Sequence, residues 1–159
     1  MSRARFSAGF FVTFVALGAA AASAADLEGP ARFCGYSPII DLLPGEQVVT
    51  TGGGIHGGTF RWSGEFGELD VSGIGWASRP PGEAARVRTS HNHVRFRQRQ
   101  QDGRYVVAIW NGEHGAAYFR SVSPLGDEQL AAIDRVDLYN EGEEPEGCDL
   151  RTIFAWGYD

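Results

Sequence analysis

Apolar and polar side chains alternate along much of this chain with a period of two residues. In residues 59–63, Phe60 and Trp62 would lie on one face of an extended strand and Arg61 on the other, and residues 68–76 repeat the pattern. Successive side chains of a strand point to opposite faces, so the alternation predicts strands that bury one face. Glycines cluster between these segments, as in the turns of an antiparallel sheet.

A central strand and a hairpin are predicted in the second half of the chain. Asp102-Gly103 is a two-residue hairpin signal, and the next segment, residues 105–110, is apolar on both faces. This predicts a buried strand in the middle of a sheet. Further strands are predicted in residues 117–122, 136–139 and 150–156.

One helix is predicted, beginning after Gly126 and ending near Arg135. Asp127 and Glu128 in its first turn favour the positive end of the helix dipole. With about seven or eight strands and one helix, the chain is predicted to be mainly β. We expect an antiparallel β-barrel or a sandwich-like meander with one short α-helix in the C-terminal half. The glycine-rich residues 52–58 are expected to form a flexible hairpin loop.

The N-terminal residues have the pattern of an export signal. A short basic stretch precedes an apolar run over residues 6–22, and small residues at 22–24 fit a signal peptidase. We predict a signal peptide in residues 1–25 and a single β-rich exported domain in residues 26–159, periplasmic or extracellular. The alternative is an uncleaved anchor, because about 17 apolar residues can just span a bilayer. No membrane span is expected after signal cleavage.

The chain has two cysteines, Cys34 and Cys148, near the two ends of the predicted mature domain. Disulfides form in the oxidising compartments that exported proteins enter, and the cysteine count is even. A bond between Cys34 and Cys148 is therefore predicted. Neither cysteine has the sequence context of a thiol enzyme, so both are expected to be structural.

All 14 basic residues are arginine, and the chain has no lysine. This excludes sites that need lysine, such as a P-loop or a Schiff base. Without Arg3 and Arg5, 12 arginines face 20 acidic residues, a formal charge of −8. That charge disfavours nucleic acid as a partner. No cofactor signature is present, and no cofactor is predicted.

Basic residues concentrate in one segment of this acidic chain. Arg95, Arg97 and Arg99 are spaced so that one strand would present all three on a single face, and Arg86 and Arg88 share this spacing. Guanidinium groups side by side repel one another unless an anion faces them. One interpretation is internal pairing with acids of the C-terminal region or of a neighbouring strand. The other is an external anion: a small molecule, an anionic glycan or an acidic protein.

The histidines offer weaker candidates. His91 and His93 would share one face of a strand, as in a two-histidine metal site, but no third ligand is evident and no metal site is predicted. A hydrolase could instead combine His91, His93 or His114 with a nearby carboxylate. A glycosidase would need paired carboxylates and aromatic platforms, for which the candidates are Glu65, Glu68, Asp70, Trp62 and Trp76.

The leading hypothesis is a small exported binding or interaction module without catalytic activity. Its expected contact surface is the arginine-rich strand face. The alternative is a small secreted hydrolase that uses histidine and carboxylate residues. Binding needs only an exposed arginine face, whereas catalysis needs histidine and carboxylate groups that converge in a cleft.

Overall fold

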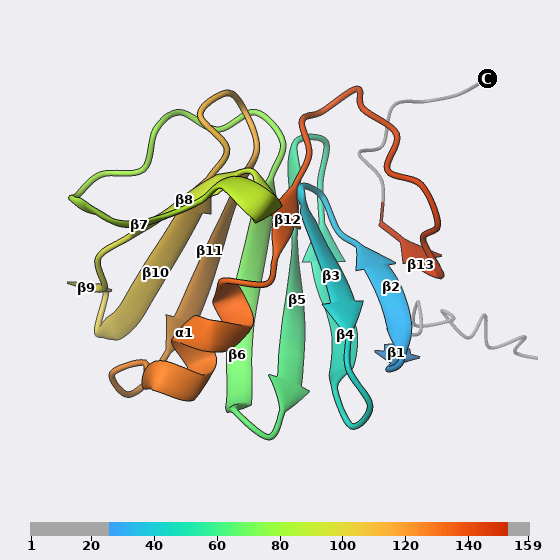
Figure 1. Cartoon of the computed structure of the whole chain (residues 1–159), viewed down its shortest axis with the longest axis horizontal. Coiled ribbons are helices and arrows are strands. Elements are labelled where there is room, and N and C mark those ends of the chain that lie inside the picture. Colours follow the sequence, from blue (N-terminus) through green and yellow to red (C-terminus); the bar gives the residue numbers. More distant parts are fainter. Residues whose placement is uncertain (1–25, 153–159) are drawn as a thin grey trace, which may run out of the picture.

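The computed structural model describes residues 26–152, and the predicted signal peptide lies outside them. Two sheets face each other, with a helix beside the smaller sheet (Figure 1). The prediction of a mainly antiparallel β-fold with one short helix is confirmed. Of the two expected architectures, the sandwich-like meander is correct, because the large sheet stays open and does not close into a barrel.

The large sheet is antiparallel throughout, and β10 lies inside it. Its strands, in spatial order, are β1 (Asp26–Glu28), β4 (Gln47–Gly53), β5 (Gly57–Gly64), β6 (Gly67–Ile74), β11 (Ala116–Ser121), β10 (Arg104–Trp110), β8 (His93–Phe96) and β7 (Ala84–Arg88). A further short strand, β9 (Arg99–Gln101), pairs with the opposite end of β10 from β8. The hairpin between β9 and β10 turns at Asp102 and Gly103, which both have positive φ, as the sequence predicted.

The small sheet was not apparent in the sequence pattern. Its strands, in spatial order, are β12 (Asp137–Leu138), β3 (Pro38–Leu42), β2 (Ala31–Cys34) and β13 (Leu150–Arg151). β13 pairs with β2 in parallel, whereas the other pairs of this sheet are antiparallel. Of the predicted strand at 150–156, Leu150 and Arg151 form β13, and residues 153–156 lie outside the described residues.

The core lies between the two sheets. Trp62 and Phe119 on the large sheet are fully buried, as is Phe33 on the small sheet. Alternate residues of the large sheet therefore face this core, as the period of two predicted. We call this side of the large sheet its inner face. The outer face points away from the small sheet and the helix (Figure 1).

Helix α1 (Asp127–Ile133) begins directly after Gly126, as predicted, and ends two residues before the predicted end. The backbone NH of Gly126 donates to the side chain of Gln129 over 3.1 Å, which satisfies one of the free groups at the helix start. Ala132 and Ile133 are buried and anchor the helix to the core. The short helix thus closes the inner side of the sandwich.

The glycine-rich segment is mostly paired strand rather than the flexible loop that was expected. Gly53 pairs with Gly58 across β4 and β5, which leaves only residues 54–56 as a turn. A Cβ atom would lie 1.9 Å from the Tyr36 side chain at Gly53 and 2.0 Å from it at Gly58. The glycines therefore make room for the Tyr36 ring.

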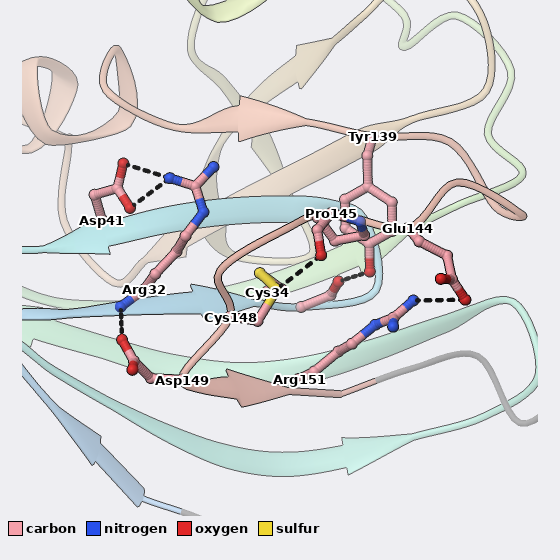
Figure 2. The surroundings of a disulfide bond; sticks show 10 residues. Arg32, Cys34, Asp41, Tyr139, Glu144, Pro145, Cys148, Asp149 and Arg151 are labelled. Atoms are coloured by element: carbon pink, nitrogen blue, oxygen red, sulfur yellow. Dashed lines mark hydrogen bonds and ion pairs between the residues drawn. A yellow bond between two sulfur atoms is a disulfide. The ribbon is translucent and has the colours of Figure 1, made fainter.

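The predicted disulfide joins Cys34, at the end of β2, to Cys148, just before β13. Figure 2 shows Arg32 beside this bond, where its side chain contacts Asp41 at 2.9 Å and its backbone NH donates to Asp149 at 2.7 Å. The disulfide is compatible with an oxidising, exported location. Among residues 26–152, no helix is long and apolar enough to cross a membrane.

Candidate functional site

The structure separates the three arginines that were predicted to share one strand. β8 ends at Phe96 and β9 begins at Arg99, and the two strands pair with opposite ends of β10. Arg95 lies on β8, Arg97 in the connection and Arg99 on β9. The expectation of one continuous arginine stripe is therefore wrong, because the strand is interrupted after Phe96.

Arg86 and Arg95 point to the inner face, where both bind Asp134. Arg95 Nε lies 2.7 Å from Asp134 Oδ1, and Arg86 Nη1 lies 3.1 Å from Oδ2. The Arg95 side chain is 12% exposed and that of Asp134 is 7% exposed. These two arginines are therefore engaged with an acid that directly follows α1. Arg97, by contrast, forms an exposed pair with Glu83 at 3.1 Å.

His91 and His93 lie close together but not on one strand. His91 belongs to the 3₁₀ turn η1 (Thr89–His91), and Asn92 adopts a left-handed conformation before His93 begins β8. Their ring centroids are 6.5 Å apart, and His91 Nδ1 lies 3.0 Å from Asp137. No group of three or more metal-ligating side chains occurs in the described part of the chain.

His93 is 3% exposed and lies directly opposite Arg88 of β7. Neither ring nitrogen of His93 has a hydrogen-bond partner among residues 26–152. Burial lowers the pKa of His93, and the nearby carbonyl of Val136 and carboxylate of Asp134 offset this only in part. His93 is therefore held as a neutral imidazole near the largely buried Arg95–Asp134 pair. The buried Arg88 Nε also lacks a partner in this part of the chain.

The other two histidines lie at one end of the sandwich. His56 Nδ1 is 2.9 Å from the nearly buried carboxylate of Glu141, and the sequence did not suggest this pair. His114 stacks on Trp76, with ring centroids 4.5 Å apart and an angle of 3° between the planes. A carboxylate-held histidine can act as a general base. Two histidines therefore have the carboxylate contact that the hydrolase alternative requires: His91, which it named, with Asp137, and His56, which it did not, with Glu141.

The aromatic platforms suggested for a glycosidase do not form as a pair. Trp62 is fully buried in the core, whereas Trp76 is 64% exposed. Glu68 and Asp70 both face outward, and Arg61 Nε lies 3.4 Å from Glu68 and 3.8 Å from Asp70. Trp62 and Trp76 therefore cannot flank one sugar together, because alternation places Trp62 on the inner face.

Arg99 lies near two arginines, Arg104 and Arg120, that were not among the predicted site residues. It pairs with Val106 of β10, and Val106 pairs on its other side with Arg120 of β11. Arg104, two residues before Val106, shares the same outward direction. We call Arg99, Arg104 and Arg120 on the outer face the arginine cluster. The alternation of side chains along the strands predicted at residues 105–110 and 117–122 could have placed Arg104 and Arg120 on the outer face. It could not have shown that they lie next to Arg99.

The arginine cluster has few acidic partners. Arg104 Nη2 lies 2.6 Å from Asp70, which also faces Arg61. Arg120 Nη1 donates to the hydroxyl of Ser72 over 2.7 Å. No residue in the range 26–152 forms a hydrogen bond or ion pair with the Arg99 side chain. Within the described residues, Asp70 is thus the only carboxylate that contacts the cluster, and it forms an ion pair with only one of the three guanidinium groups, that of Arg104.

The electrostatics of the cluster reflect this imbalance. Burial lowers the pKa of Arg120, and the positive charges of Arg104 and Arg99 lower it further. Tyr118 lies beside them, and the Arg120 guanidinium is 5.7 Å from its ring centroid. The group is therefore a partly desolvated concentration of positive charge that an anion would relieve.

Comparison with known proteins finds no matching family model and no significantly similar curated protein or solved structure.

Proposed function

We propose that this protein is a small exported binding module that holds an anionic ligand on the outer face of its large sheet. The arginine cluster is the contact surface, and no catalytic step is involved. The proposal keeps the binding hypothesis from the sequence but moves its site. Arg99 remains part of it, whereas Arg86 and Arg95 are occupied by Asp134.

The lack of an acidic partner for the Arg99 guanidinium within residues 26–152 carries this proposal. Guanidinium groups form strong, often bidentate hydrogen bonds with carboxylate, sulfate and phosphate groups. Arg104 and Arg120 lie on the neighbouring strands and share only Asp70 between them. An anion between Arg99 and Arg120 would therefore gain two charge-assisted contacts and relieve their mutual repulsion.

We further propose that the protein acts in the periplasm or outside the cell, after removal of residues 1–25. The disulfide between Cys34 and Cys148 supports this, because such bonds persist in oxidising compartments. Intact-mass analysis of exported protein tests the cleavage. The expected mature chain begins at Ala25 or Asp26, and a species that keeps residues 10–15 would contradict it.

Retention on immobilised heparin tests the binding function. The whole chain has a formal charge of −6 at pH 7, so general charge attraction would not hold it on a polyanion. We expect wild-type protein to be retained and to elute with added salt, because exposed charges are screened within about 8–10 Å at physiological ionic strength.

The matched variants are Arg99→Gln and Arg97→Gln. Both remove one charge from an arginine of the same segment, but Arg97 lies outside the cluster and pairs with Glu83. We expect Arg99→Gln to elute at clearly lower salt and Arg97→Gln to behave like wild type. Equal elution of the two variants, or no retention of wild type, would contradict the proposed site.

A further inference from the structure

One row of outward-facing residues crosses five strands of the large sheet. The strand register places Arg61 on β5 opposite Asp70 on β6, and Asp70 opposite Arg120 on β11. The row continues through Val106 on β10 to Arg99 on β9. Because directly paired residues point to the same side of a sheet, all five side chains lie on the outer face.

Arginine occupies every second position of this row. Neighbouring strands lie about 4.8 Å apart, so Arg61, Arg120 and Arg99 follow one another at steps of roughly 10 Å across the sheet. Asp70 lies between the first two and contacts Arg61 at 3.8 Å, and Glu68, outside the row, contacts Arg61 at 3.4 Å. Val106, 1% exposed, lies between the last two. The row therefore offers cations at a regular spacing, separated by one acid and one apolar residue.

A second row, two residues further along the strands, carries hydroxyl groups. It consists of Thr59, Ser72 and Tyr118, which pair directly with one another across β5, β6 and β11. The Ser72 hydroxyl already accepts a hydrogen bond from Arg120. Hydroxyl groups can both donate and accept hydrogen bonds, which suits a ligand that carries hydroxyl groups of its own.

We propose that the ligand is an anionic polysaccharide that lies across the strands, with one acidic group per disaccharide. This inference rests on the proposed anion-binding function and names its ligand class. An extended disaccharide repeat is about as long as two strand spacings, so successive acidic groups meet Arg99, Arg120 and Arg61. The sugar hydroxyls then face the second row.

The arrangement favours this ligand over a single small ion or a polyphosphate. A single ion contacts one or two neighbouring arginines and gains nothing from Arg61 at the far end of the row. A polyphosphate carries charge at a much closer spacing and would place some of it opposite Asp70, where like charges repel. The row of hydroxyl groups would also lack partners on a polyphosphate.

Isothermal titration calorimetry with hyaluronan oligosaccharides tests the inference, since these carry one carboxylate per disaccharide. We expect affinity to rise from disaccharide to tetrasaccharide to hexasaccharide and to level off beyond, when all three arginines of the row are engaged. Each step is expected to be roughly tenfold, which corresponds to one added charge-assisted contact.

Two variants and three other ligands define the outcomes. Arg99→Gln should lower the hexasaccharide affinity to that of wild type for the tetrasaccharide, and Arg97→Gln should leave it unchanged. If phosphate or glucuronate bound as tightly as the hexasaccharide, the proposal of an extended ligand would be overturned, but the anion site would stand. If a dodecathymidylate strand bound more tightly than the hexasaccharide, the proposal that the ligand is a polysaccharide would be overturned. If wild type bound none of these anions, the proposed function itself would fail. Melting curves of each variant establish that it is folded.

Discussion

Arg99 and Arg120 flank the same residue, Val106, from two different neighbouring strands of the outer face. They are 21 positions apart in the sequence and become neighbours only because β9 and β11 both pair with β10. Arg95, four residues from Arg99, faces the opposite side of the sheet and binds Asp134. Arginines of one sequence segment therefore have different partners and, on our account, different roles.

Stability should separate the two kinds of arginine. Replacing Arg95 by Gln removes one partner of the nearly buried Asp134, although Arg86 remains, and should lower the free energy of unfolding by about 1–3 kcal/mol. Replacing Arg99 by Gln removes repulsion from the cluster, so unfolding free energy should stay within about 0.5 kcal/mol of wild type or rise slightly. Urea unfolding curves measure both. A loss at Arg99 as large as that at Arg95 would mean that Arg99 has an internal partner.

Acid should destabilise the fold through His93. Its pKa is lowered in the folded protein, so the unfolded chain takes up a proton at higher pH than the folded chain does. The contribution of the neutral His93 side chain to the free energy of unfolding is complete above about pH 6.5. It is lost as the pH falls from there through the lowered folded pKa, by at most about 1.4 kcal/mol per pH unit.

The variant His93→Phe should therefore show a weaker loss of stability between pH 7 and pH 5 than wild type. His56, which is exposed, serves as the matched position, and His56→Phe should keep the steep loss that depends on His93. Thermal melting across this pH range measures the difference. Identical pH profiles of wild type and His93→Phe would show that another group controls acid stability.

The disulfide should stabilise the fold strongly. It closes a loop with a sequence separation of 114 residues, for which the chain-entropy model gives up to about 4–5 kcal/mol. Folded exported protein should contain no free thiol when it is denatured without reductant. Reduction should lower the melting temperature by several degrees. Two titratable thiols per chain would show that the bond does not form.

The contact between Gly58 and Tyr36 gives a local test of the fold. A Cβ at Gly58 would lie 2.0 Å from the Tyr36 ring, whereas at Gly54 the nearest atom is 3.9 Å away. Gly58→Ala should therefore cost about 1–3 kcal/mol, and Gly54→Ala should cost little. The cost at Gly58 should shrink in a Tyr36→Ala background. An equal cost in both backgrounds would place the strain elsewhere.

The sequence predicted those elements whose signals are local. Alternation around Phe60 and Trp62 predicted β5, the Asp102-Gly103 turn predicted the β9–β10 hairpin, and Gly126 marked the start of α1. The two cysteines predicted the disulfide because no other pairing was available. Strands were also predicted where β12 and β13 lie, but the short strands β2 and β3 were missed. The small sheet itself was missed because β12 and β13 pair with β3 and β2 across large sequence separations.

The candidate site depended on information that no single segment contains. Spacing suggested that Arg95, Arg97 and Arg99 share a face, but the end of β8 at Phe96 separates them. Strand parity could place Arg104 and Arg120 outward, since Tyr105 and Phe119 next to them pack on the core. Only the order of the strands brings Arg120 beside Arg99, and that order follows from packing of the whole chain.

The most direct test of the account is a titration of the arginine Nε–Hε signals in ¹H–¹⁵N NMR spectra with a hyaluronan hexasaccharide. Single Arg→Gln variants assign the signals. We expect the signals of Arg61, Arg99, Arg104 and Arg120 to shift with added ligand and to return with added salt. The signals of Arg86 and Arg95, bound to Asp134, should stay in place. Shifts confined to Arg86 and Arg95, or no shift at Arg99 and Arg120, would contradict an anion-binding site on the outer face.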